Sequence, residues 1–243
     1  MVNIDTVYQK VLALANKEQR GYITPQEFNL LADKAQLEVF DSYFHEFKML
    51  DLKPKTNNVK SDDTEFVEEK LAPFKTAMAW SLPDSNGLPY LSLPSNLYRL
   101  NSVHKMGSSN FEFFPIEPMT IEEVTYTEMN PLTKATKKRM VYVREPNNIL
   151  TILPFYQDGD DPISGVVNFF RKPTTPKWGY VVVKGKALWN NNTTYTTHFE
   201  LHPSEEEILV SKIIAMAGLT IMKPEIIQAG GGMEAAIKQS QND

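Results

Sequence analysis

Residues 16–27, NKEQRGYITPQE, have part of the spacing of a calcium-binding EF-hand loop. Counted from residue 16, a glycine stands sixth, an isoleucine eighth and a glutamate twelfth, as such loops require. The fifth position is Arg20, however, whose guanidinium has no lone pair to donate and repels a cation. We therefore expect no calcium site. Gly21 ends a helix or its following turn, and Glu27 completes a capping box with Thr24.

Two further clusters could hold a metal ion. In THFELH, a strand would place His198, Glu200 and His202 on one face, where two imidazoles and a carboxylate could bind zinc. A strand also turns polar residues outward by default, and no second cluster supplies a general base. In QDGDDP, three aspartates could hold a cation loosely, although Gly and Asp are the commonest turn residues. They are Asp158, Asp160 and Asp161. We interpret THFELH as a solvated face and QDGDDP as a turn.

A basic run precedes a predicted strand in TKATKKRMVYVR. Lys134, Lys137, Lys138 and Arg139 beside Tyr142 could grip a nucleic-acid backbone, and an acidic protein surface is an equally suitable partner. The net charge of −5 over 243 residues argues against a dedicated nucleic-acid binder. A lysine-rich hairpin loop that only aids solubility is the simpler interpretation.

The composition excludes several classes of enzyme. The chain has no cysteine, so disulfides, thiolate metal sites and a cysteine nucleophile are impossible. It has no Gly-x-Ser-x-Gly elbow, and its one glycine run, AGGGME, follows a helix, whereas a phosphate loop follows a strand. No apolar stretch approaches the length of a membrane span. We predict a protein that is not an enzyme and has no catalytic residue, cofactor, metal or membrane partner.

Apolar periodicity predicts helices at both ends of the chain. Residues 3–17 and 25–50 repeat apolar side chains at helical spacing, and the helical period returns after Pro203. Between them, short runs of β-formers alternate with turn signals, and MTIEEVTYTEMN suits a short helix that starts at Thr120. We predict an α+β fold in which both chain ends form a helical bundle and a mostly antiparallel β-domain is inserted. The expected domains are 1–73 with 203–243, and 74–202.

The two longest helices carry more apolar surface than one neighbour can cover. A wide apolar stripe of this kind suits a bundle that also packs against copies of itself. We therefore expect one subunit interface on the bundle, around Phe44 and Phe47, and another on the β-domain. The candidate interface residues are Phe28, Phe40, Phe44, Phe47, Ile213 and Met216.

Both ends of the chain resemble one family of viral proteins. VLALANKEQRGYITPQEFNLLADKAQLEVFDSYF resembles the opening, and FELHPSEEEILVSKIIAMAGLTIMKPEIIQAGG the ending, of ring proteins from the tails of crAss-like phages and related podoviruses. The resemblance implies a head-to-tail connector: a ring, dodecameric by analogy, stacked beneath the portal around the DNA channel. Its implied partners are itself, the portal protein and other tail ring or tail fibre proteins, with DNA only as the passing genome. Its implied location is the virion tail, assembled in the host cytoplasm.

Two other functions stay open from the residues alone. The aromatic residues Trp178, Tyr180, Trp189 and Tyr195 could make a carbohydrate- or receptor-binding β module of a phage tail, although such residues more often fill a core. A hydrolase could use the acidic stretch 158–161 with His198.

Overall fold

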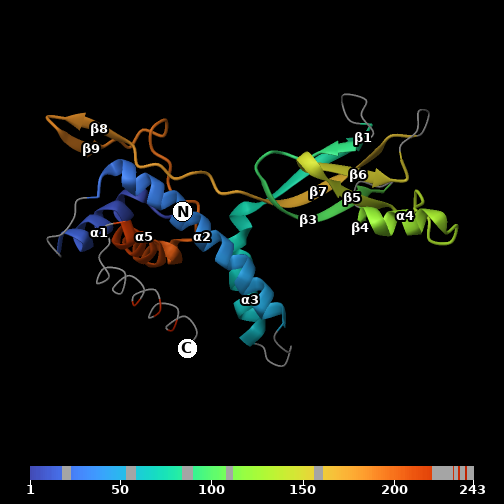
Figure 1. The fold of residues 1–243 in the computed structure, drawn as a ribbon, viewed down its shortest axis with the longest axis horizontal. Helices are drawn as coiled ribbons and strands as arrows, with labels where there is room; N and C mark the ends of the chain where they lie inside the picture. The colour runs from blue at the N-terminus through green and yellow to red at the C-terminus, as the bar shows by residue number, and fades with distance from the viewer. Residues whose placement is uncertain are drawn as a thin grey trace. The chain divides into compact units, whose positions relative to one another are not determined.

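The chain folds into two compact units (Figure 1). A computed structural model describes residues 1–17, 23–52, 59–83, 90–107, 112–155 and 161–220, with 232, 235 and 239. The first unit, here the terminal unit, joins Met1–Pro73 to Pro173–Asp243. The second, the sheet unit, is Phe74–Lys172. Residues 173–202, which we expected in the inserted domain, therefore belong with the two ends of the chain.

The long helix of the terminal unit begins where local signals place it. Thr24 N donates to Glu27 Oε2 at 2.9 Å and Glu27 N donates to Thr24 Oγ1 at 3.3 Å, which is the expected capping box at the start of the long helix. A 3-10 turn, η3 (Pro203–Glu205), precedes the last helix. The helices are α1 (Ile4–Lys17), α2 (Pro25–Leu52), α3 (Val59–Leu71) and α5 (Glu206–Thr220).

The prediction that both chain ends form a helical bundle is wrong. The largest element is a seven-stranded mixed sheet in the sheet unit, and the five helices among the described residues do not make a bundle from the ends. In the terminal unit, much of the helical surface is covered by the extended segment 173–202, whose side chains Trp178, Phe199 and Leu201 are fully buried. Phe199 also bridges to Val2 at the start of the chain.

Two amide side chains of α2 hold this extended segment. Asn29 Oδ1 accepts from Trp178 N at 2.7 Å, and Asn29 Nδ2 donates to Trp178 O at 3.3 Å. Gln36 is completely buried; its Nε2 donates to Thr174 O at 2.8 Å and its Oε1 accepts from Glu200 N at 3.2 Å. The amides thus satisfy backbone groups that a neighbouring strand would satisfy in a sheet.

A hairpin grows out of the extended segment. It consists of β8 (Tyr180–Val183) and β9 (Lys186–Trp189), which pair antiparallel. Lys184 and Gly185 form the two-residue turn, with φ of 50° and 77°. Two consecutive residues with positive φ are the mark of the tight hairpin turns that match strand twist, and glycine is favoured there.

A buried ion pair joins α3 to the start of α5. Lys70 Nζ lies 2.7 Å from Glu205 Oε1, and the two side chains are only 5% and 2% exposed. Tyr43 of α2 packs beside the pair; burial, and then the charge of Glu205, raise the pKa of its phenol above the usual range. The pair therefore brings three helical elements of the terminal unit to one buried point.

The sheet unit is built on a single sheet in the order β1-β7-β3-β4-β5-β6-β2. The outer strands β1 and β2 approach one another, so the sheet is a nearly closed barrel. All pairs are antiparallel except β4 with β5. The strands are β1 (Lys75–Leu82), β2 (Tyr90–Ser92), β3 (Leu97–Met106), β4 (Phe113–Met119), β5 (Val141–Glu145), β6 (Ile149–Leu153) and β7 (Ile163–Arg171).

Helix α4 (Ile121–Met129) makes the connection that the parallel pair β4–β5 requires. It starts at Thr120, as the sequence predicts, with Thr120 and Glu123 forming a complete capping box. Its residue Val124 packs on a small cluster that includes Val141 and Val143. No residue of α4 is buried, so the helix lies on the outside of the barrel.

The barrel interior is filled by apolar side chains from all seven strands and from the segments that join them. Gly165 of β7 shows how tight the packing is: a Cβ there would lie 2.0 Å from His104 O and 2.5 Å from the Trp80 ring. Across the described residues, no helix is long and apolar enough to cross a membrane.

Two leucines of the extended segment provide a test of its structural role. Leu201 is fully buried, whereas Leu188 is 53% exposed. Leu201→Ala should lower the free energy of unfolding of the terminal unit by about 2–5 kcal/mol, because it removes buried methyl groups and leaves a cavity. Leu188→Ala should change it by less than about 0.5 kcal/mol. Urea unfolding followed by far-UV circular dichroism measures both; equal costs would contradict the fold.

The buried ion pair predicts a non-additive pair of substitutions. Lys70→Met or Glu205→Leu alone should cost about 3–5 kcal/mol, because each leaves a buried charge without its partner. The double variant should cost less than either single variant, since no buried charge remains. The same urea titration gives the three values, and additive costs would show that the two charges do not interact.

Candidate functional site

The residues of the predicted zinc cluster each have a separate structural role. His198 Nδ1 accepts from Ile4 N at 3.3 Å, and the Glu200 carboxylate accepts from Thr174 N and Oγ1 at 3.0 and 2.8 Å. His202 Nδ1 caps the turn η3 by accepting from Ser204 N at 3.3 Å. Their segment makes only isolated bridges and no regular strand. In the part of the chain that the structure describes, no three His, Cys, Asp or Glu residues could hold a metal ion.

The other two stretches considered as cation sites lie largely outside the described residues. Asp158 and Asp160 of the acidic stretch lie there, and so do Arg20 and Gly21 of the stretch with EF-hand spacing. Glu27, the twelfth residue of the EF-hand spacing, is described, and its carboxylate accepts from Thr24, which lowers the pKa of Glu27. Hydrogen bonding at the helix start therefore accounts for this glutamate.

The basic run does not form a nucleic-acid groove. Lys134 Nζ lies 3.5 Å from Glu128 Oε2, and Arg139 Nη2 lies 2.8 Å from Glu117 Oε2, so two of the four cations are paired with carboxylates. Tyr142 is buried in the barrel core and cannot stack on a base. The aromatic residue that nucleic-acid binding requires at this place is therefore not accessible.

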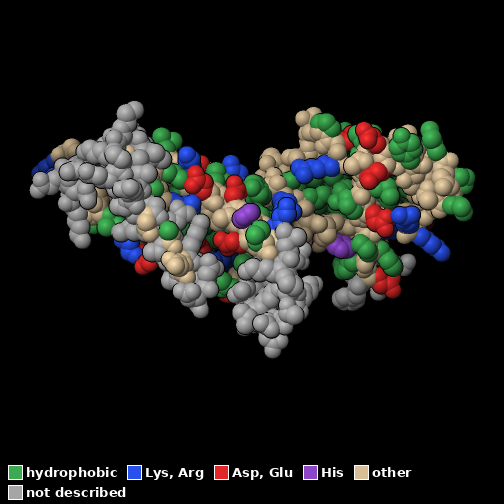
Figure 2. Space-filling model, turned by 60° about the horizontal axis from the view of Figure 1, so that its bottom comes forward, with side chains coloured by type: hydrophobic (Ala, Val, Ile, Leu, Met, Phe, Trp, Pro, Cys, Tyr) green, Lys and Arg blue, Asp and Glu red, His purple; other side chains and the backbone are tan. Residues whose placement is uncertain are grey.

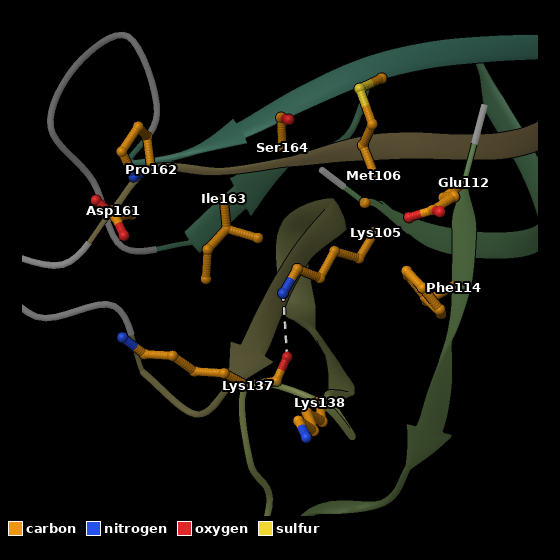
Figure 3. Close-up of a pocket in the computed structure, with 11 residues that line it drawn as sticks. Lys105, Met106, Glu112, Phe114, Lys137, Lys138, Asp161, Pro162, Ile163 and Ser164 are labelled. Carbon is orange, nitrogen blue, oxygen red and sulfur yellow. Dashed lines mark hydrogen bonds between the residues drawn. The ribbon is translucent and has the colours of Figure 1, made fainter. Parts of the chain in front are cut away.

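Lys137 and Lys138 instead line a pocket of the sheet unit with Lys105 (Figure 3). The pocket has a volume of about 680 Å³, and Lys105 Nζ donates to Lys137 O at 3.0 Å, so the lysine from β3 is held against the basic loop. Two carboxylates, Glu112 and Asp161, share the lining. None of the eleven lining residues, all of them described, is a histidine. The three lysines outnumber the two carboxylates, so the lining is slightly basic.

The six candidate interface residues divide between core and surface. Phe28, Phe40 and Ile213 are completely buried, and Met216 is nearly so, which makes them part of the core of the terminal unit. Phe44 is partly buried and packs edge-on against Phe40 at 5.1 Å. Phe47, at 38% exposed, is the member of the set that a second chain can reach.

The hairpin β8–β9 carries an exposed apolar surface of the terminal unit. We define the hairpin patch as Val181, Val182, Val183 and Leu188, whose exposed fractions run from 47% to 62%. In an antiparallel pair, residues directly opposite share a face. Val181 pairs with Leu188, and Val182 with Ala187, so both faces of the hairpin are apolar and reach solvent.

The base of the hairpin is fixed while its strands remain uncovered. Trp178 packs on Tyr8 at 4.3 Å and donates from Nε1 to Asp5 at 2.9 Å. Gly179 N donates to Thr196 Oγ1 at 3.2 Å. The hairpin is therefore held at its root by α1, α2 and the returning chain, and it presents its apolar residues beyond that root.

A second apolar surface lies on the sheet unit. Ile121, Tyr126, Met129 and Leu132 of α4 and the turn after it are all well exposed. Figure 2 shows hydrophobic side chains at the surface at the end of the view where Figure 1 places α4. Because α4 buries no residue of its own, this surface adds apolar area that the sheet unit itself does not cover.

The four aromatic residues proposed for sugar binding do not form one platform. Trp178 is in the core, and Tyr180 stacks on it with ring centroids 5.8 Å apart. Trp189 and Tyr195 remain exposed.

No known protein-family model matches the chain, and no curated protein matches it significantly.

Proposed function

We propose that the protein is a structural subunit that assembles with copies of itself into a ring, the head-to-tail connector of a phage tail. The observation that carries the proposal is the hairpin patch. Supporting it are the resemblance of both chain ends to tail ring proteins and the structural roles taken by the residues that could otherwise do chemistry.

The sequence of the hairpin is typical of a strand that is covered on both sides. Three consecutive valines put apolar side chains on both faces, as strands buried on both faces do. A lone two-stranded hairpin is at best marginally stable in water. In this chain the base of the hairpin is held in place, but the valines and Leu188 on its strands are exposed. A partner that covers the strands would therefore bury apolar surface that is exposed in the single subunit.

The exposed surface of α4 gives the sheet unit a place for a different partner. A connector must contact the portal and the next tail component in addition to its own copies. We assign the α4 surface, centred on Met129 and Leu132, to such a contact. A net charge of −5 suits a ring through which DNA slides without adhering.

A receptor- or carbohydrate-binding module is a second candidate, favoured by the exposed rings of Trp189 and Tyr195. Sugar sites place polar groups around an aromatic platform to bind hydroxyl groups. The residues next to Trp189 on its face of the hairpin are Tyr180, Val182 and Ala187, which are mostly apolar. The aliphatic character of the hairpin favours a protein partner.

Cryo-electron microscopy of virions that contain this chain tests the proposal. We expect the chain as a ring coaxial with the portal. The variant Val181→Ser/Val183→Ser should reduce incorporation into particles about tenfold, because polar side chains cannot replace the buried apolar contact. Its unfolding free energy should change little, since both valines are half exposed.

Leu30→Gln is the matched control, because Leu30 is an exposed apolar residue of the same unit outside the hairpin. Its incorporation should equal that of the unaltered chain. Finding the protein in the capsid shell, at a fibre tip or absent from particles would refute the connector role.

A further inference from the structure

The tip of the hairpin adds charge to its apolar surface. Lys184 lies in the turn and Lys186 begins β9, so two ammonium groups stand beside Val183 at the end of the hairpin. Val181, Val183 and Leu188 of the hairpin patch share one face with Lys186, so this face and the cationic tip form one small surface. A partner that fits it must be apolar at its centre and acidic at its rim.

A surface with those properties lies elsewhere on the terminal unit, where α2 packs on α3. Phe47 of α2 and Phe66 of α3 are exposed apolar side chains. Lys70 Nζ lies 4.4 Å from the centre of the Phe66 ring and 5.5 Å from that of Tyr43. Phe66 therefore sits beside α2 about one turn before Phe47, and the exposed rings belong to one area.

The acidic rim comes from α3. Glu65 and Glu69 are exposed and one helical turn apart, so they lie on one side of the helix, the side that borders Phe66. On α2, Lys48 is exposed and Glu46 is partly exposed, so among the described residues α3 carries most of the exposed negative charge of this area. We call the exposed residues Phe47, Phe66, Glu65 and Glu69 the acceptor face.

We propose that the hairpin of one copy docks on the acceptor face of the next copy, with Val181, Val183 and Leu188 against the exposed rings and the tip lysines against Glu65 and Glu69. This inference rests on the proposed function, because it names the contact through which the ring would close. The partner is a second copy because the same chain carries both complementary surfaces, and the described residues that form them are exposed.

The geometry of such a contact is head-to-tail. Two different patches meet, so the interface is heterologous and repeats around a ring when the rotation closes. Each hairpin offers eight residues, from two strands of four, whereas a standard stable interface uses about 20–30 residues a side. One contact alone is therefore weak, and ring closure or a portal template is needed to hold it.

Introduced cysteines test the contact directly, because the natural chain has none. Full-length chains carrying both Lys186→Cys and Glu69→Cys are assembled into particles and treated with a short thiol cross-linker. A head-to-tail contact produces a ladder of covalent multimers. Chains with either cysteine alone should stay monomeric, whereas a two-fold symmetric contact would give dimers from one of them.

The control pair is Lys186→Cys with Lys34→Cys, which places the second thiol on α2 away from the acceptor face. It should give no ladder. A ladder of equal strength from the control pair would overturn the proposed contact.

Charge reversal supplies an independent readout. Lys184→Glu/Lys186→Glu should lower incorporation into rings about tenfold, because like charges then face each other. Adding Glu65→Lys/Glu69→Lys to the same chain should restore most of it, since opposite charges again face each other. Failure of the second pair to restore assembly would overturn the acceptor face.

The outcomes separate this inference from the connector role. Rings in particles without a ladder would overturn the contact and leave the connector role standing. A ladder from free chains, with no ring in particles, would support the contact and refute the connector role.

Discussion

The terminal unit depends on two amide side chains that take the place of a neighbouring strand. Asn29 and Gln36 are seven residues apart, or about two helical turns, so they lie on the same side of α2. Between them they bond backbone groups of Thr174, Trp178 and Glu200. An extended chain cannot be buried against a helix unless its backbone groups find partners. These amides supply them, and the positions of Trp178, the hairpin root and the returning chain follow.

Local signals predicted the starts of α2 and α4 correctly. The capping boxes Thr24–Glu27 and Thr120–Glu123 need only residues three apart, and both are present. By contrast, the packing of the extended segment 173–202 on the helices depends on contacts between residues more than a hundred apart in sequence, such as Gln36 with Thr174. An Asn and a Gln within an amphipathic helix read as solvent-facing, so the wide apolar stripe was assigned to other helices. Strands β4 and β5 pair across the helix that separates them along the chain. Local patterns therefore did not predict this parallel pair or the near-closure of the barrel.

The same distinction explains the candidate interface. Helical periodicity identifies apolar residues but not what covers them, so Phe28, Phe40 and Ile213 were placed at a subunit boundary although they are core. Only exposure separates such residues from Phe47. The valine run of β8 predicted a strand, yet its lack of cover could be seen only in three dimensions. Apart from Phe47, the sequence patterns therefore did not identify the exposed apolar residues that are available for an interface.

The exposed hairpin also bears on how the isolated protein behaves in solution. A short apolar strand with an open edge is a template for unwanted β-pairing between chains. Lys184 and Lys186 act as gatekeepers at its tip, because their mutual repulsion opposes stacking of identical hairpins. Salt screens that repulsion. Colloidal stability of the unassembled protein is thus tied to two charges, and concentrated stocks should keep best at low ionic strength.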